Sequence, residues 1–330
     1  HNRQPTTDNR QPTTDNRQPT TDNRQPTTDN RQPTTDNRQP TTGNRQPATD
    51  NQKTMKLINI GCGPVFHPDW INLDLVSHSP QVVAHDLTRG LPFAAEAVDA
   101  CYSSHVLEHL RPEEARFFLD EQRRVLKPGG VLRVVVPDLE AISRIYLAAL
   151  AEVLAGAPEA AFAYDYSVLE LYDQTTRERS GGELLKLWLA ESLGEREIAY
   201  ILHRHGREAE LAIRSLRAPV ADAASAPRPA LRRRLDRART FLAEAAVFGL
   251  LGRGALRAFR EGRFRASGEI HRVMYDRYSL RRLLAARGFT EIAQCAATES
   301  RIPDFARYQL DSIDGATRKP DSMFMEAIRA

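Results

Sequence analysis

Short apolar runs, separated by polar and helical segments, set the pattern of the chain between residues 57 and 136. The runs cover residues 57–60, 70–74, 82–86, 98–102 and 131–136. Apolar runs of this length that alternate with helical patterns are typical of strand–helix–strand units in a parallel sheet. We therefore predict an α/β fold with a mostly parallel sheet, in which ligands bind beyond the carboxyl ends of the strands.

The segments between and after these runs carry helix signals. Pro112 stands at a first helical position with acids behind it, and the apolar spacing continues to residue 126. Lys-Pro-Gly-Gly at 127–130 is predicted to end that helix. Asp138 is a predicted N-cap for a second helix that reaches residue 154. Further along, a helix is expected over 279–287 and the antiparallel closing strands over 289–295 and 322–327.

The first apolar run ends in a glycine turn, Gly61-Cys62-Gly63. Glycines at this place let the backbone turn tightly and approach a ligand where a side chain would block it. A dinucleotide fingerprint would need a third glycine where Phe66 stands, and the chain has no Gly-Lys-Ser/Thr phosphate loop. The loop therefore suits a small nucleoside rather than a pyrophosphate or triphosphate.

Polar side chains also close the later runs. Asp74 ends the second run and can accept from both hydroxyls of a ribose, because an ionised carboxylate offers two acceptor oxygens. Asp86 ends the third run and could accept from an adenine amino group. The fourth run is followed by Ser103, Ser104 and His105.

Four motifs in this order resemble the cofactor motifs of class I S-adenosylmethionine-dependent methyltransferases: Ile-Gly-Cys-Gly (60–63), Asn-Leu-Asp (72–74), Ser-His-Val-Leu-Glu-His (104–109) and Leu-Lys-Pro-Gly-Gly (126–130). The chain looks like the type 11-like branch, often linked to bacterial surface-glycan assembly. The resemblance implies a Rossmann-like, mostly parallel seven-stranded sheet with helices on both faces, and S-adenosyl-L-methionine as cofactor. The cofactor-binding residues it implies are Gly61, Cys62, Gly63, Asp74, Leu75, Asp86, Leu87, Ser103, Ser104 and His105.

The first crossover departs from the usual pattern. Residues 61–70 alone separate the first two runs, whereas a parallel crossover usually needs a dozen residues or more. We predict a loop with one turn at most, fixed by Pro64, Pro68 and Trp70. The alternative is an ordinary strand–turn–strand of another α/β enzyme.

Histidines supply the candidate acid–base chemistry. His105 and His109 stand four apart, but the zinc-protease order is His-Glu-x-x-His and no third ligand lies at a telling spacing, so no metal site is predicted. Glu108 and His109 are expected to fasten a helix start to the sheet. His105 and His271 are the candidate bases for a hydroxyl acceptor, with a packed histidine that caps the following helix as the alternative for His271.

The chain before Met55 is a tandem repeat. Residues 2–50 repeat Asn-Arg-Gln-Pro-Thr-Thr-Asp with a period of seven, and the repeat differs from this unit only at Gly43 and Ala48. The repeat has no large apolar side chain, so we predict a disordered tail over residues 1–54, as a spacer, an adhesive arm or a solvated end. A tandem repeat of one seven-base DNA unit encodes the same heptapeptide in every forward reading frame. The tail is therefore also interpreted as translated repeat DNA, with Met55 as the natural start of the protein.

The remaining chain divides into a cofactor-binding half over 55–154, a helical insertion over 155–268 and closing strands over 269–330. Residues 228–265 hold eleven Arg against three acids, with apolar side chains at helical spacings. Such a basic amphipathic helix pair lies on anionic membranes or binds phosphates, or forms a solvated cover over a core stripe. No feature indicates specific nucleic-acid binding.

Cysteine usage and hydropathy favour a cytoplasmic protein. Cys62, Cys101 and Cys295 show neither metal spacing nor an even disulfide set, and no transmembrane run exists. We predict a cytoplasmic enzyme, peripheral to the inner membrane if 228–265 binds lipid, that methylates an oxygen, or less favourably a nitrogen, of a glycan or lipid-linked acceptor. The competing hypothesis is a non-catalytic binding module in a glycan assembly complex. The acceptor and the oligomeric state stay open.

Overall fold

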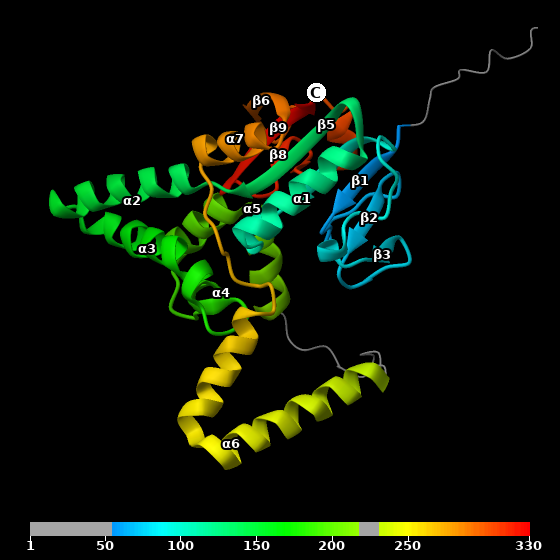
Figure 1. Cartoon of the computed structure of the whole chain (residues 1–330). Helices are drawn as coiled ribbons and strands as arrows, with labels where there is room; N and C mark the ends of the chain where they lie inside the picture. The colour runs from blue at the N-terminus through cyan, green and yellow to red at the C-terminus, as the bar shows by residue number, and fades with distance from the viewer. Residues whose placement is uncertain (1–54, 218–230) are drawn as a thin grey trace, which may run out of the picture. The chain divides into compact units, whose positions relative to one another are not determined.

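The computed structural model describes residues 55–217 and 231–330 (Figure 1). The predicted repeat tail lies outside these residues. The central sheet has seven strands in the order β3-β2-β1-β4-β5-β9-β6. Its strands are β1 (Leu57–Ile60), β2 (Ile71–Asp74), β3 (Val82–Ala84), β4 (Val98–Ser104), β5 (Leu126–Pro137), β6 (Phe289–Cys295) and β9 (Ser322–Arg329). A separate hairpin pairs β7 (Ser312–Ile313) with β8 (Ala316–Thr317).

The first strands pair in parallel, from β3 through β2, β1 and β4 to β5. Strand β9 pairs antiparallel with both β5 and β6. The predicted mostly parallel seven-stranded sheet and its antiparallel closing pair are therefore confirmed.

The α-helices are α1 (Pro112–Val125), α2 (Leu139–Leu154), α3 (Ala161–Thr176), α4 (Gly182–Trp188), α5 (Glu195–Arg217), α6 (Leu231–Arg265) and α7 (Arg277–Ala286). The 3₁₀ turns are η1 (Leu87–Arg89), η2 (Leu107–His109), η3 (Pro158–Ala160) and η5 (Phe305–Tyr308). The backbone N–H of Ala141 donates to Asp138 Oδ1, which confirms the predicted cap of α2. Helix α1 ends before Lys-Pro-Gly-Gly, but that motif already belongs to β5, with Gly129 at φ 75°.

No helix occupies the crossover from β1 to β2, as the short spacing predicts. The loop is held by two buried strand amides. The Asn59 side chain donates to Val65 O at 3.1 Å, and the Asn72 side chain donates to Trp70 O at 2.9 Å. Trp70 is 3% exposed and packs edge-on against aromatic rings, whereas Pro64 is exposed. Amides and the indole therefore fix this loop more than the prolines do.

The two faces of the sheet are covered differently. Helices α1 and α7 pack on one face, through buried residues such as Leu119 and Leu280. The other face is covered by η5 and the chain between β6 and β9, through Phe305, Tyr308 and Leu310. This second cover places polar groups of the C-terminal loop at the carboxyl end of the sheet.

A buried arginine fastens the second cover. Arg133 on β5 is fully buried; its Nε lies 2.6 Å from Asp311 Oδ2 and its Nη1 lies 2.8 Å from Glu326 Oε1. Tyr102 donates to the other oxygen of Asp311 at 2.5 Å. The network joins β4, β5, β9 and the loop that holds Asp311.

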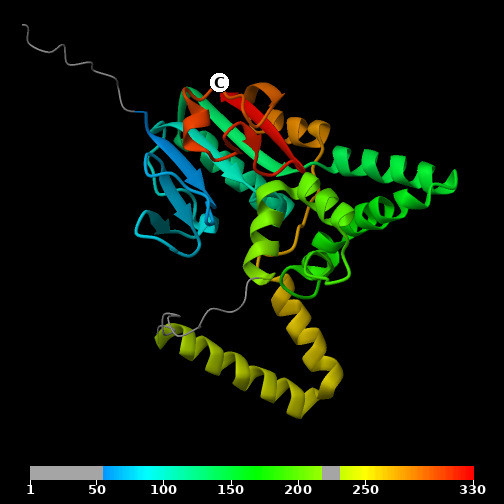
Figure 2. The same cartoon turned by 180° about the vertical axis from the view of Figure 1, so that it is seen from behind.

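Helices α3, α4 and α5 share a small core of their own, which includes Tyr166, Trp188 and Ile201. Helix α6 is two helical segments that meet at Gly252, where φ is 80° and ψ is −173°. Arg260 lies 2.7 Å from Glu244 across this corner, so the segments form the V seen in Figures 1 and 2. The predicted helix pair is present in that form.

Candidate cofactor and acceptor site

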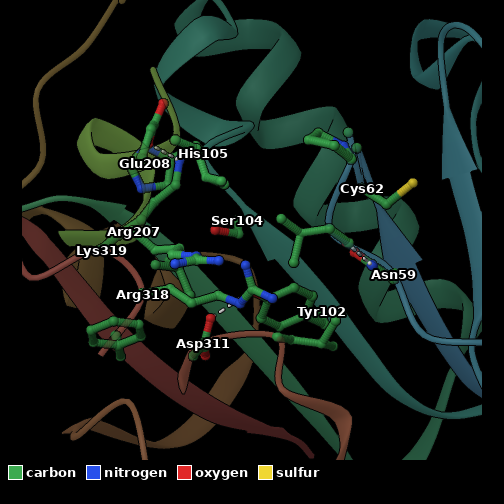
Figure 3. Close-up of a pocket in the computed structure, with 18 residues that line it drawn as sticks. Asn59, Cys62, Tyr102, Ser104, His105, Arg207, Glu208, Asp311, Arg318 and Lys319 are labelled. Atoms are coloured by element: carbon green, nitrogen blue, oxygen red, sulfur yellow. Dashed lines mark hydrogen bonds and ion pairs between the residues drawn. The ribbon is translucent and has the colours of Figure 1, made fainter. Parts of the chain in front are cut away.

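A cavity of about 300 Å³ opens at the carboxyl ends of β1 and β4. Figure 3 shows Cys62 of the glycine loop on one side and His105 with Glu208 on the other. The remaining wall comes from α5 and from the loop after β8, through Arg207, Arg318 and Lys319. The cavity is thus built from segments far apart in the chain.

The glycine loop turns as the sequence predicts. Gly61 has φ 68°, and a Cβ there would lie 2.4 Å from the Val106 side chain, so only glycine fits. Gly63 has φ 51°, and a Cβ there would meet no atom within 4 Å. The backbone of Gly63 therefore faces open space in which a ligand can approach it.

Asp74 joins the end of β2 to this loop. Its Oδ2 accepts from Gly63 N at 2.8 Å and its Oδ1 accepts from Val76 N at 3.2 Å. A carboxylate oxygen has two lone pairs, so both oxygens can still accept from ribose hydroxyls.

Replacing Asp74 with Ala is expected to weaken S-adenosylmethionine binding by about 1.5–3 kcal/mol, the scale of a hydrogen bond to a charged group. Calorimetric titration measures the change. Asp69→Ala, an exposed carboxylate paired with Arg307, is the control and should bind as wild type does. Binding within twofold of wild type for Asp74→Ala would mean that another group holds the ribose.

The other predicted cofactor residues divide into two sets. Ser104 and His105 line the cavity with the glycine loop. Ser103 is 1% exposed and does not line the cavity, and Leu75 is 66% exposed. Leu87 packs against the main core.

Asp86 caps η1 by accepting from Thr88 N at 3.0 Å and from its hydroxyl at 2.7 Å, and these bonds lower the pKa of the exposed carboxyl. An adenine amino group could therefore bind Asp86 only while the same carboxylate also accepts from Thr88. Burial raises the pKa of the Cys62 thiol to about 11, with Asp74 adding to the shift, so Cys62 lines the cavity as a neutral thiol.

His105 follows β4 in the left-handed region, with φ 55°. Its Nδ1 lies 3.1 Å from Glu108 Oε1, and its Nε2 lies 2.9 Å from the Ser322 hydroxyl. An ionised carboxylate only accepts, so Nδ1 carries the proton and Nε2 keeps its lone pair. Burial alone would raise the pKa of Glu108, but the bond from His105 and the neighbouring imidazoles of His109 and His271 lower it to about 2. Glu108 is therefore an ionised partner that orients His105.

A second cavity, of about 260 Å³, lies on the other side of His105. It shares His105, Glu208 and Lys319 with the first cavity. Its own lining is polar and includes Arg177 and His271. His105 therefore stands between a cavity at the glycine loop and a polar cavity beside it.

His271 is 6% exposed and packs edge-on against His109, with ring centroids 4.8 Å apart. Burial lowers the pKa of His271 to about 3, so its imidazole is neutral. Helix α7 is capped by Asp276, which accepts from Ser279 N at 2.7 Å. The expected capping role of His271 is therefore wrong, because the acid next to the helix start takes that position. The predicted helix start at His109 is only the short 3₁₀ turn η2.

The wall formed by α5 and the C-terminal loop is not among the features predicted from the sequence. Gly206 interrupts α5 with φ 55° and ψ −131°, and a Cβ there would lie 2.6 Å from Arg318 O. Beyond this break, Arg207 N donates to Arg318 O at 3.1 Å, and Glu208 Oε2 lies 2.9 Å from Lys319 Nζ. A glycine inside a long helical pattern is the one local signal that marked this close approach.

Residues 59–134 match the family described as a methyltransferase domain. This segment of the chain is similar to a methyltransferase domain. The match covers β1, the glycine loop, Asp74 and most of β5, which are the elements that carry the predicted cofactor motifs.

The chain is similar in part to solved structures. A 1,6-didemethyltoxoflavin-N1-methyltransferase from Burkholderia thailandensis is 16% identical, with 26% of this chain aligned to 46% of that chain and a TM-score of 0.23. A SAM dependent methyltransferase from Archaeoglobus fulgidus is 10% identical over 83% of this chain and 86% of that one, with a TM-score of 0.33. The chain thus spans less than half of the first of these structures.

A search of curated proteins finds no significant match. Among residues 55–217 and 231–330, no helix has the length and apolarity needed to span a bilayer.

Proposed function

We propose that this methyltransferase transfers the methyl group of S-adenosylmethionine to an oxygen of a glycan or lipid-linked acceptor. The observation that carries the proposal is the position of His105, between the cavity at the glycine loop and the polar second cavity. A base at that boundary can take the acceptor proton while the acceptor faces the cofactor.

The residues present fit the cofactor. A side chain at Gly61 would clash with Val106, and one at Gly63 would be strained at φ 51° and would occupy the open space. Asp74 presents two acceptor oxygens at the end of β2. When bound, S-adenosylmethionine supplies an electrophilic sulfonium methyl group. The glycine loop and Asp74 would hold its nucleoside part, and the space toward Ser104 and His105 would hold the reacting end. Walls from α5 and the C-terminal loop exclude water from that end.

His105 has the geometry of an oriented base. Glu108 fixes the proton on Nδ1, which leaves Nε2 to accept. With the cofactor bound, His105 Nε2 would accept the proton of the acceptor hydroxyl as that oxygen takes up the methyl group, and the demethylated cofactor would be the leaving group. Ser322, which now holds that nitrogen at 2.9 Å, marks where an acceptor hydroxyl would donate. His271 is a poorer candidate because it is 6% exposed, packs against the His109 ring and does not line the cavity at the glycine loop.

The test is a screen for radiolabelled methyl transfer from S-adenosylmethionine into fractions of a bacterial extract, with glycan, lipid and protein fractions kept apart. We expect label in a glycan or lipid-linked fraction, stable to conditions that hydrolyse esters. Label confined to protein, or label only on nitrogen, would contradict the proposed acceptor. Binding of the cofactor without transfer to any fraction would favour the non-catalytic module.

Helix α6 supports a second proposal, a peripheral contact with an anionic membrane. Its exposed apolar side chains lie in the segment before the corner at Gly252: Phe241, Leu242, Phe248, Leu250 and Leu251 are 48–83% exposed. The expected core stripe is therefore absent from the described part of α6, and the apolar face is open. Arginines such as Arg253 and Arg257 stand beside it and complement anionic headgroups.

Vesicle flotation tests this contact. The bound fraction is expected to rise with anionic lipid and to fall as salt rises, since each arginine near the surface contributes about 1 kcal/mol. Replacing Leu250 and Leu251 with Ser should lower the bound fraction, whereas Leu147→Ser on α2, also exposed, should not. Equal partitioning into neutral and anionic vesicles, or none into either, would contradict the proposal.

A further inference from the structure

Three potential metal ligands lie together beside the second cavity: His109 and His271 line it, and Glu108 is buried next to them. One donor atom from each lies within 4.8 Å of the others. Two come from η2 and the third from the segment before α7, which the backbone joins to η2 because Arg272 N donates to Glu108 O at 2.6 Å. The ligands are therefore held by two segments that are fixed to each other.

Part of this polar cluster has no partner in the protein. Glu108 is fully buried, and its Oε2 has no hydrogen-bond partner in the described residues. His271 is 6% exposed, and its Nδ1 also has none in residues 55–217 and 231–330. A buried acceptor without a partner is costly, and such groups are usually satisfied by a ligand or an ion.

The tautomer of His109 fits a ligand. Its Nδ1 lies 3.4 Å from Ile270 O. A carbonyl only accepts, so Nδ1 carries the proton and Nε2 keeps the lone pair. Metal-binding histidines commonly donate their other ring N–H to a backbone carbonyl in this way.

A neighbouring cluster shows the contrast. Glu170, His205 and Asp321 also lie close enough to hold a metal. There, Arg204 lies 2.7 Å from Glu170, and His205 Nδ1 lies 3.2 Å from Asp321. That cluster is an ion-pair network with its own cation. Among the described residues, the His105 imidazole is the one group within ion-pair distance of Glu108, and no arginine or lysine pairs with it.

We propose that Glu108, His109 and His271 bind a divalent transition-metal ion of the zinc class. Two imidazoles and one carboxylate are a ligand set that zinc takes in sites with an open fourth position. Zinc bonds of about 2.0–2.2 Å require the donor atoms to draw closer than they now lie. The fourth position would face the second cavity. If the proposed function holds, it would bind the acceptor oxygen beside His105. Sequence spacing missed the site because His271 comes from a distant segment.

The test is metal binding by the full chain after treatment with a chelator, without S-adenosylmethionine. Zinc is titrated by calorimetry, and cobalt is added as a spectroscopic probe. We expect one ion per chain, a cobalt spectrum typical of a four-coordinate site, and a rise in melting temperature with zinc. His271→Ala and His109→Ala should each weaken binding by at least the roughly 10–100-fold that loss of an outer partner costs.

The controls are His203→Ala, an exposed histidine on α5, and His205→Ala in the ion-pair network. Both should bind zinc as wild type does. No binding by wild type up to millimolar zinc, or equal loss in His203→Ala and His271→Ala, would overturn the site. Loss with His205→Ala but not with His271→Ala would overturn it too. Circular dichroism checks that each variant is folded. Because cofactor and acceptor are absent, failure of methyl transfer does not affect the result.

Discussion

Replacing Arg133 with Met is expected to destabilise the fold by about 3–5 kcal/mol, the cost of removing one partner from a buried ion pair. Arg133 is fully buried between Asp311 and Glu326. Without its guanidinium, both carboxylates would remain buried with no cation, and the loop that holds Asp311 would lose its attachment to β5. Urea unfolding followed by circular dichroism measures the change.

The matched control is Arg144→Met on α2. Arg144 is 72% exposed and lies 2.6 Å from Glu140, so the loss should stay below about 1 kcal/mol. A loss for Arg133→Met as small as that of the control would mean that Asp311 and Glu326 are protonated or hydrated in solution. It would also mean that Arg133 does not hold the Asp311 loop over the second face of the sheet.

Replacing His105 with Asn is expected to lower the rate of methyl transfer by about 10²–10⁴-fold, the usual contribution of a general base. Asparagine tolerates the left-handed backbone at φ 55°, so the turn after β4 is retained while the base is lost. Cofactor affinity should change far less than turnover. Single-turnover kinetics separate the two effects.

The exposed histidine His203 serves as the control, and His203→Ala should leave the rate unchanged. Equal rates for His105→Asn and wild type would show that His105 does not take the proton. Loss of cofactor binding in parallel with the rate would instead make His105 a cofactor ligand.

Local features of the fold could be predicted because they depend on neighbouring residues. The glycine turn after β1, the cap at Asp138 and the crossover without a helix follow from backbone geometry and chain length. The two amides that hold that crossover could not be predicted. In the sequence, Asn59 and Asn72 look like ordinary strand residues. Only the register of β1 and β2 shows that they lie side by side.

The site was less predictable because it combines distant segments. The carboxyl ends of β1 and β4 were predicted from the parallel sheet. The walls from Arg207 and Lys319 depend on the break in α5 at Gly206, which lies against a loop more than a hundred residues later. Ser103 is expected at the site from the sequence, but alternation along β4 puts it on the opposite face of the sheet, where it is buried, and leaves Ser104 at the cavity.

The central claim, a methyltransferase that binds S-adenosylmethionine at the glycine loop, is tested most directly by calorimetric titration of the full chain. The account predicts saturable binding of S-adenosylmethionine and of its demethylated product, at one site per chain, weakened in Asp74→Ala. The absence of binding of either compound up to millimolar concentration would contradict it.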